Sequence, residues 1–254
     1  MPGREGVARE GPALAAGVPA PDVETASAGY ARRFAGPLGA WFLDVQARLT
    51  LELLRPWPAA RVLDVGGGHG QLTGALVEAG YRVTVFGSPG ACGETLRPWV
   101  ENGRARYEAG DLLKAPFADR AFDAVVSFRL LPHMGDWSAL ARELCRLAAR
   151  TVVVDYPTRR SVNAAAEALF GLKRAVEKDT RPFTVLADAD VRAALFASGF
   201  RVTARRPEFL FPMALHRALR APRAARALEG AARATGLTRL LGSPVVLRAE
   251  RDGL

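Results

Sequence analysis

The sequence contains little that could bind a metal ion, form disulfides or cross a membrane. Its 254 residues include two cysteines, Cys92 and Cys145, and three histidines. No Cys-x-x-Cys pair and no Cys/His cluster with the spacing of zinc ligands occurs, so we expect neither a metal site nor a disulfide framework. No apolar run is long enough for a signal peptide or a membrane span. These absences favour a cytoplasmic protein without a bound metal.

Lysine is also scarce: three of the 35 basic residues are lysine, although the formal net charge is +9. Eleven arginines and only four acids follow Phe200, so the C-terminal part is strongly basic. Such a face could attract RNA, an anionic membrane surface or an acidic substrate. Abundant alanine and the preference for arginine also fit a GC-rich coding sequence, which would produce this charge without a partner. We therefore expect a solvated basic face and no nucleic-acid partner.

Apolar runs alternate with helix-like segments along most of the chain, which is typical of a parallel sheet with helices on both faces. The length allows one α/β domain with a full core. The expected strands cover residues 61–66, 81–86, 105–111, 121–128, 150–156, 201–206 and 244–251, and the main helices cover residues 40–55, 70–80, 92–101, 136–148 and 188–200. Asp136 has the character of a helix N-cap, and Gly80 and Gly199 of helix stops.

Three segments depart from this alternation. Residues 1–28 are rich in Gly, Pro and Ala, and we expect them to be a mobile N-terminal tail before a single domain over residues 29–254. Residues 157–183 are too long for a simple connection and should form a cap inserted after strand five, over one end of the sheet. Residues 212–242 should form basic helices, interrupted at proline and glycine.

A glycine-rich loop follows the first expected strand. Residues 61–90 read RVLDVGGGHGQLTGALVEAGYRVTVFGSPG, with Gly66, Gly68 and Gly70 at alternate positions. Side chains at these positions would block a ligand lying across the end of the strand. The dinucleotide pattern Gly-x-Gly-x-x-Gly is broken at Gln71, and no Gly-Lys-Ser/Thr follows, so a pyrophosphate ligand is disfavoured. Glycine also serves tight strand-to-helix turns, so the loop alone leaves both roles open.

Three segments taken together are more specific. They are VLDVGGGHG, AGDLLKAPFADRAFDAVVSFRLLPHMGDW and VVVDYP, over residues 62–70, 109–137 and 152–157. As a set they resemble the class I S-adenosylmethionine-dependent methyltransferases, in particular the small-molecule branch that includes quinone-biosynthesis enzymes. The resemblance implies a Rossmann-like fold with a seven-stranded, mostly parallel sheet. It also implies methyl transfer from the cofactor S-adenosylmethionine to a small-molecule acceptor, which we expect to be methylated at oxygen.

The same resemblance implies a set of cofactor-binding residues. In the family pattern, the acid at Asp111 accepts a hydrogen bond from the adenine amino group, and the Leu112 backbone N–H contacts the ring; a plain turn residue after a glycine is the alternative for Asp111. Asp64 would orient the loop near the cofactor's ammonium group. The full set of expected cofactor-binding residues is Tyr30, Arg33, Asp64, Gly66, Gly67, Gly68, Phe86, Gly87, Ser88, Asp111, Leu112 and Phe128.

Tyr30 and Arg33 belong to a segment that relatives close over the cofactor, and a lid of this kind would exclude water. The alternative is a helix packed on the core, because Tyr30 and Phe34 are spaced at i and i+4.

The end of the second strand lacks a carboxylate. Most relatives carry an acid there that accepts hydrogen bonds from both ribose hydroxyls, and alignment on the Ser-Pro that follows puts Phe86 in its place. Hydrogen bonds to a charged acceptor are worth about 1.5 to 3 kcal/mol. We therefore expect binding of S-adenosylmethionine in the micromolar range or weaker, and we expect Phe86→Asp to tighten it. Ser88 could accept a hydrogen bond from one hydroxyl.

His133, in the segment LLPHMGDW, lies where relatives carry a histidine near the active site. Its pKa range suits proton removal from an alcohol or phenol acceptor, so we expect it to act as the catalytic base. A structural histidine that caps the loop before Asp136 is the alternative. Two other functions stay open: an RNA methyltransferase that uses the arginine-rich C-terminal segment, and a methyltransferase-like protein that binds a partner without catalysis.

Overall fold

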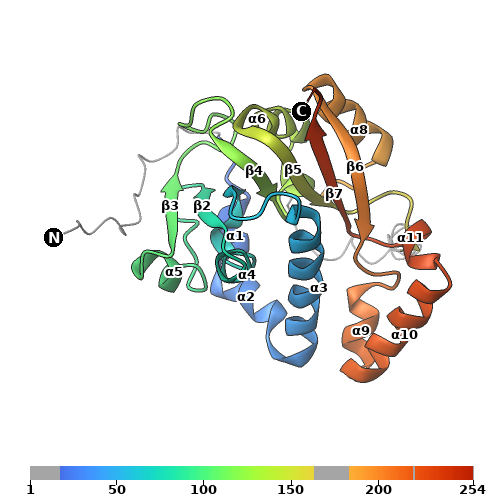
Figure 1. Cartoon of the computed structure of the whole chain (residues 1–254). Coiled ribbons are helices and arrows are strands. Elements are labelled where there is room, and N and C mark those ends of the chain that lie inside the picture. The colour runs from blue at the N-terminus through green and yellow to red at the C-terminus, as the bar shows by residue number, and fades with distance from the viewer. Residues whose placement is uncertain (1–17, 163–182, 220, 254) are drawn as a thin grey trace.

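A seven-stranded sheet forms the centre of the molecule (Figure 1). The structure is a computed structural model and describes residues 18–162, 183–219 and 221–253. The strands are β1 (Arg61–Val65), β2 (Arg82–Gly87), β3 (Ala105–Ala109), β4 (Phe122–Ser127), β5 (Ala148–Tyr156), β6 (Phe200–Pro207) and β7 (Val245–Arg251). Each strand coincides with a predicted one to within a few residues.

The strand order is β3-β2-β1-β4-β5-β7-β6, and β7 runs antiparallel to both of its neighbours. The other pairs are parallel; β1, for example, pairs with β2 from Arg61↔Arg82 to Val65↔Phe86. The chain order reverses direction between β1 and β4, and open α/β sheets bind ligands beyond the carboxyl ends of strands at such a point. The predicted Rossmann-like fold with a seven-stranded, mostly parallel sheet is confirmed.

Helices cover both faces of the sheet (Figure 1). They are α1 (Asp22–Thr25), α2 (Ala28–Ala31), α3 (Gly36–Leu54), α4 (Thr73–Glu78), α5 (Arg97–Glu101), α6 (Trp137–Leu147), α8 (Asp188–Ala197), α9 (Met213–Leu219), α10 (Pro222–Ala234) and α11 (Leu237–Leu241). Apolar side chains of α6 and α8 pack on one face, and those of α3, α4 and α5 pack on the other. The sheet is therefore buried on both sides, as its near-continuous apolar strands require.

Local sequence signals explain where several helices begin and end. The Asp136 carboxylate accepts a hydrogen bond from the Ala139 backbone N–H at 2.8 Å, which confirms it as the N-cap of α6. Gly80 and Gly199 follow α4 and α8 with φ values of +87° and +77°, a region that glycine occupies without strain. Helix α4 begins three residues later than predicted because Gly70 itself takes a positive φ of 68°.

The structure describes the N-terminal segment from residue 18 onwards. Residues 1–17 of the predicted tail lie outside the described residues, and the remainder contains α1 and the first residue of α2. Asp22, at the start of α1, is 1% exposed and therefore packs against the rest of the protein. The greater part of the predicted cap, residues 163–182, lies outside the described residues.

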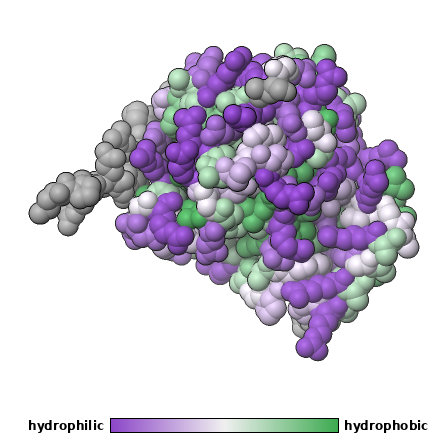
Figure 2. All heavy atoms as spheres, viewed as in Figure 1, coloured by the Kyte–Doolittle hydropathy of each residue, from purple (hydrophilic) through white to green (hydrophobic). Residues whose placement is uncertain are grey.

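The predicted basic segment of residues 212–242 contains α9, α10 and α11. Helices α9 and α10 pack beside α3 through a separate apolar cluster that contains Trp41, Phe42, Phe209 and Ala225. The surface seen in Figure 2 is mainly hydrophilic, with hydrophobic residues showing in places near its middle. Among the described residues, no helix combines the length and the apolar character needed to cross a bilayer.

Candidate cofactor site and acceptor cavity

The glycine loop turns sharply at the carboxyl end of β1. Gly66 has a φ of +76°, and its N–H donates to the Phe86 carbonyl at 2.7 Å, which ties the loop to β2. A Cβ placed on Gly68 would lie 1.8 Å from the Ala91 carbonyl oxygen. A Cβ on Gly67 would lie 2.1 Å from the Asp64 carboxylate. Glycine is therefore required here, because backbone and carboxylate occupy the space that any side chain would need.

Asp64 lies beneath this loop and is completely buried. Neither of its carboxylate oxygens has a hydrogen-bond partner within the described part of the chain. Burial raises the pKa of this carboxyl to about 7. A buried acid without partners costs free energy unless a polar or cationic group meets it, so its position next to the glycine loop is consistent with a ligand group at this point.

Gly66, Gly67 and Gly68, which the sequence predicted to bind the cofactor, thus form a turn next to a buried carboxyl group that has no hydrogen-bond partner among the described residues.

The end of β2 is built differently from the expectation. The Phe86 side chain is completely buried and belongs to the core on the α6 face. Its ring lies 5.5 Å, centroid to centroid, from that of Phe117, and its tip would be 3.0 Å from a Cβ on Gly110. Phe86 is therefore a core residue, and the aromatic ring accounts for the glycine at position 110.

A carboxylate from elsewhere in the chain reaches the end of β2. The two carboxylate oxygens of Asp22 accept hydrogen bonds from the Ser88 hydroxyl at 2.6 Å and the Ser88 N–H at 2.7 Å. A Cβ on Gly87 would lie 3.0 Å from Asp22. Burial raises the pKa of the Asp22 carboxyl, although the hydrogen bonds from Ser88 oppose this effect. Ser88 thus holds the N-terminal segment against the carboxyl end of β2, a contact that the sequence pattern did not indicate.

Asp111 and Leu112 lie at the turn that follows β3. One carboxylate oxygen of Asp111 accepts a hydrogen bond from the Leu113 N–H at 2.9 Å, as an Asx turn requires. Leu112 is completely buried in the core on the α6 face, whereas Phe128 is buried on the opposite face. The turn alternative for Asp111 is thus present in the structure, and its second oxygen can accept a further hydrogen bond.

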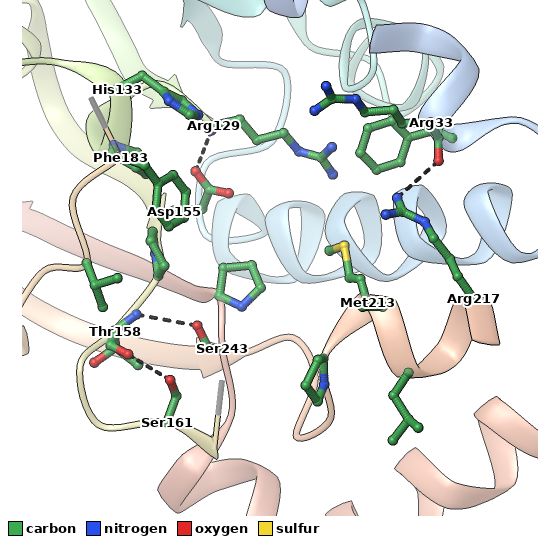
Figure 3. A pocket seen from close by; sticks show the side chains of 18 of the residues that line it. Arg33, Arg129, His133, Asp155, Thr158, Ser161, Phe183, Met213, Arg217 and Ser243 are labelled. Carbon is green, nitrogen blue, oxygen red and sulfur yellow. Dashed lines mark hydrogen bonds between the residues drawn. The ribbon is translucent and has the colours of Figure 1, made fainter. Parts of the chain in front are cut away.

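A cavity of about 830 Å³ opens beside the carboxyl ends of β4 and β5 (Figure 3). This volume lies within the range of small-molecule sites. The described residues that line it are Tyr30, Arg33, Phe34, Arg129, Pro132, His133, Asp155, Pro157, Thr158, Ser161, Phe183, Val185, Pro212, Met213, Ala214, Leu215, Arg217, Ala218, Ser243 and Pro244. It includes three expected site residues, Tyr30, Arg33 and His133. The glycine loop, Asp111 and Phe128 do not line it.

Arg129 directly follows Phe128 at the end of β4 and has a φ of +58°, an uncommon conformation for a residue other than glycine. Its backbone N–H donates to Asp155 at 2.5 Å, and its guanidinium binds the Gln46 side-chain oxygen at 2.7 and 3.1 Å. The same guanidinium lies 4.0 Å from the centroid of the Phe34 ring. Arg129 therefore joins β4, β5, α3 and the N-terminal segment at the wall of the cavity.

Two buried carboxyl groups stand near Arg129. Burial raises the pKa of Asp155 to about 6, and burial together with the charge of Asp155 raises the pKa of Glu208 to about 8. One carboxylate oxygen of Glu208 has no hydrogen-bond partner among the described residues. Neither Asp155 nor Glu208 was predicted as a site residue, although the end of β5 was visible in the sequence pattern and could have indicated Asp155.

His133 lies in a short 3₁₀ turn, Leu131–His133, whose proline favours that geometry. Its backbone N–H donates to the Leu130 carbonyl at 3.0 Å, and its ring centroid is 5.6 Å from that of Phe183. The ring lines the cavity, so a molecule bound there would meet it. In the part of the chain that the structure describes, no group of three or more His, Cys, Asp or Glu side chains could hold a metal ion.

Substitution of a glycine in the loop tests how closely the loop is packed. Gly68→Ala should destabilise the protein by about 1–3 kcal/mol, because the new methyl group meets the Ala91 carbonyl and must displace backbone. Gly230→Ala is the matched control, since nothing lies within 4 Å of its Cβ in α10 and alanine favours helix by about 1 kcal/mol. Chemical denaturation measures both; equal midpoints for the two variants would contradict the packing described.

Comparison with known proteins agrees with this geometry. Residues 62–151 match the family model of a methyltransferase domain. The chain is 31% identical over 196 residues to a demethylmenaquinone methyltransferase of Beutenbergia cavernae, covering 67% of this chain and 78% of that protein. It is 29% identical over 109 residues to an O-methyltransferase of Pyrenophora dematioidea, covering 39% of this chain and 40% of that relative's length.

The fold matches solved structures at lower identity. Magnesium protoporphyrin IX methyltransferase from Synechocystis, crystallised with S-adenosylhomocysteine, superposes with a TM-score of 0.63 at 16% identity, covering 90% of this chain and 96% of that one. The sheet order, the glycine loop at the switch point and the relationship to the Beutenbergia enzyme agree with one another. The chain belongs to the class I S-adenosylmethionine-dependent methyltransferases.

Proposed function

We propose that the protein transfers a methyl group from S-adenosylmethionine to an oxygen atom of a small molecule held in the cavity of about 830 Å³. One observation carries the proposal: the glycine loop and the cavity lie at the carboxyl ends of neighbouring strands. The loop follows β1, which pairs with β4, and the cavity begins at the residues after β4 and β5. A donor on the loop and an acceptor in the cavity would therefore be adjacent.

The residues of the loop fit this cofactor. Gly66, Gly67 and Gly68 allow the tight turn at the carboxyl end of β1, and the Asp64 carboxylate beneath it, which has no hydrogen-bond partner among the described residues, suits an ammonium group. When bound, S-adenosylmethionine supplies a methyl group on a positively charged sulfur, which is already activated for transfer. The chain then has mainly to position the two reactants and exclude water. Helix α1 contacts the glycine loop and is suited to that exclusion.

On the acceptor side, His133 would take the proton from the hydroxyl group that is methylated. The relationship to an O-methyltransferase and to a demethylmenaquinone methyltransferase supports a small-molecule acceptor. Two of the three arginines of α10 make contacts within the fold: Arg233 donates to the Glu208 carbonyl at 2.6 Å, and Arg226 lies 5.9 Å from the Trp41 ring centroid. These contacts favour a small molecule over RNA.

The proposal is tested by calorimetry with S-adenosylhomocysteine. We expect the unmodified protein to bind it, and Asp111→Ala to weaken binding by about 1–3 kcal/mol through loss of a hydrogen-bond acceptor. Asp44→Ala, which removes an exposed acid of α3, is the control and should bind as the unmodified protein does. Absence of any binding by the unmodified protein would refute the proposed function. Equal affinities of the unmodified protein and both variants would show that Asp111 only stabilises the turn in which it lies.

A further inference from the structure

Three arginines lie together at one end of the cavity. Figure 3 shows Arg33, Arg129 and Arg217 gathered there, whereas Thr158 and Ser243 lie at the opposite end. The three come from different parts of the chain: the N-terminal segment, the end of β4 and helix α9. The fold therefore brings three positive charges to one wall.

The buried carboxyl groups of Asp155 and Glu208 stand near Arg129 and offset part of its charge, whereas Arg33 and Arg217 are exposed. Among the described residues, none of the three arginines forms an ion pair. The Arg129 guanidinium binds the neutral side chain of Gln46, and Arg217 donates to the backbone carbonyl of Arg33 at 3.2 Å. Asp155 is the one acid among the described lining residues; burial raises its pKa to about 6, and it accepts its hydrogen bond from a backbone N–H.

The rest of the cavity is predominantly apolar. Most of the other described lining residues are apolar, among them Phe34, Pro132, Phe183, Met213 and Leu215. Apolar walls exclude water and so strengthen the attraction between a cation and an anion that binds beside them. Arg33 and Arg217 are exposed at the surface, so they can meet a ligand without first being uncovered. A guanidinium group binds oxyanions in a planar, two-point geometry.

We infer that the cavity binds a mostly apolar small molecule that carries an oxyanion, such as a carboxylate, and that Arg33 and Arg217 bind this oxyanion. Arg129, fixed by Gln46 and Phe34, adds positive potential deeper in the same wall. The anion serves as a handle that orients the molecule along the cavity. If the proposed function is correct, this molecule is the methyl acceptor. The preference for an anion is inferred from the cavity alone and does not depend on the proposed function.

Two fluorescent probes test the preference because they share an aromatic body and differ in charge. They are 8-anilinonaphthalene-1-sulfonate, which is anionic, and N-phenyl-1-naphthylamine, which is neutral. We expect the unmodified protein to bind the anionic probe roughly tenfold or more tighter than the neutral one, at one site, with each probe displacing the other. The double variant Arg33→Gln/Arg217→Gln should lose most of this difference while it keeps its affinity for the neutral probe.

The matched control is Arg223→Gln/Arg239→Gln, which removes two exposed positive charges from α10 and α11 outside the cavity. It should bind both probes as the unmodified protein does. Equal affinity of the two probes for the unmodified protein would overturn the inference. A matching loss of affinity for the anionic probe in the control variant would also overturn it, because overall charge would then attract the anion. An equal loss of affinity for both probes in the double variant would do the same, because the arginines would then only maintain the cavity.

The outcome is separable from that of the proposed function. Calorimetry with S-adenosylhomocysteine tests the proposed function and does not involve the probes. A protein that discriminates between the probes but does not bind S-adenosylhomocysteine would keep the anion site and lose the methyltransferase assignment. The reverse result would keep the enzyme and reject the anion site.

Discussion

Phe86→Asp should lower the melting temperature by on the order of 10 °C. The substitution removes a completely buried ring that packs against Phe117, and it places a carboxylate among apolar side chains. Loss of a buried phenylalanine costs about 3–5 kcal/mol, and an unpaired buried charge adds to this cost. For a chain of this size, each kcal/mol corresponds to about 2–4 °C. The sequence-based expectation that this variant tightens cofactor binding is revised accordingly.

The control for this experiment is Phe196→Asp. Phe196 lies on α8 and is 61% exposed, so the same chemical change should move the melting temperature by only a degree or two. Thermal melting of both variants, followed by calorimetry with S-adenosylhomocysteine, gives the answer. A stable Phe86→Asp protein that binds the ligand more tightly would mean that the new carboxylate reaches the ribose and that the ring can be replaced.

His133→Ala should reduce turnover of an oxygen acceptor by on the order of a hundredfold, with affinity for S-adenosylhomocysteine almost unchanged. The reason is that His133 lines the acceptor cavity and not the glycine loop, so it would act on the proton of the acceptor without holding the cofactor. A methylation assay with a panel of phenols and hydroxyquinones, carried out across a pH series, measures the change. The variant should be slower than the unmodified protein throughout this series.

Two further measurements distinguish a base from a structural residue. Added imidazole should restore part of the lost rate, because a small base can enter the space vacated in the cavity. The melting temperature should stay close to that of the unmodified protein. A large fall in melting temperature without rescue by imidazole would assign His133 to the structural role and leave the base to be found elsewhere on the cavity wall.

The elements that local sequence dictates were predicted well. Buried strands such as β5 read as continuous apolar runs, and the helix signals at Asp136, Gly80 and Gly199 act within one or two turns of the residue itself. The family resemblance supplied the number of strands and their mostly parallel arrangement, whereas the strand order is seen only in the structure, because pairing across the sheet depends on contacts between distant residues. The start of α4 was placed too early because the turn at Gly70 depends on the loop packed against it.

The candidate site was predicted only in part, for the same reason. The contact between Asp22 and Ser88 joins residues 66 positions apart, and nothing in the composition of the N-terminal segment indicates it. Phe86 stood where relatives carry an acid, yet only the positions of Phe117 and Gly110 show that its ring faces the core. The three arginines of the cavity wall likewise come together only through the fold.

The buried carboxyl groups have a consequence for how folding exchanges protons with the solvent. Burial raises the pKa of Asp64 to about 7, and burial and the charge of Asp155 raise that of Glu208 to about 8, so in the folded protein both carboxyls stay protonated to a higher pH than in the unfolded chain. The stability that this protonation contributes is complete below the ordinary carboxyl pKa and is lost as the pH rises through these values. Burial lowers the pKa of His69 to about 3, so this residue makes the folded protein more stable as the pH rises. Its effect is confined to pH values below the ordinary histidine pKa of 6.5.

Between pH 6.5 and 8.5 the carboxyl groups therefore dominate, and the protein should melt at progressively lower temperature as the pH rises. Unfolding in this range releases protons, so the measured heat of unfolding should depend on the ionisation enthalpy of the buffer. Glu208→Gln, which fixes the neutral form, should flatten the upper part of the curve. An unchanged slope in that variant would assign the proton exchange to Asp64.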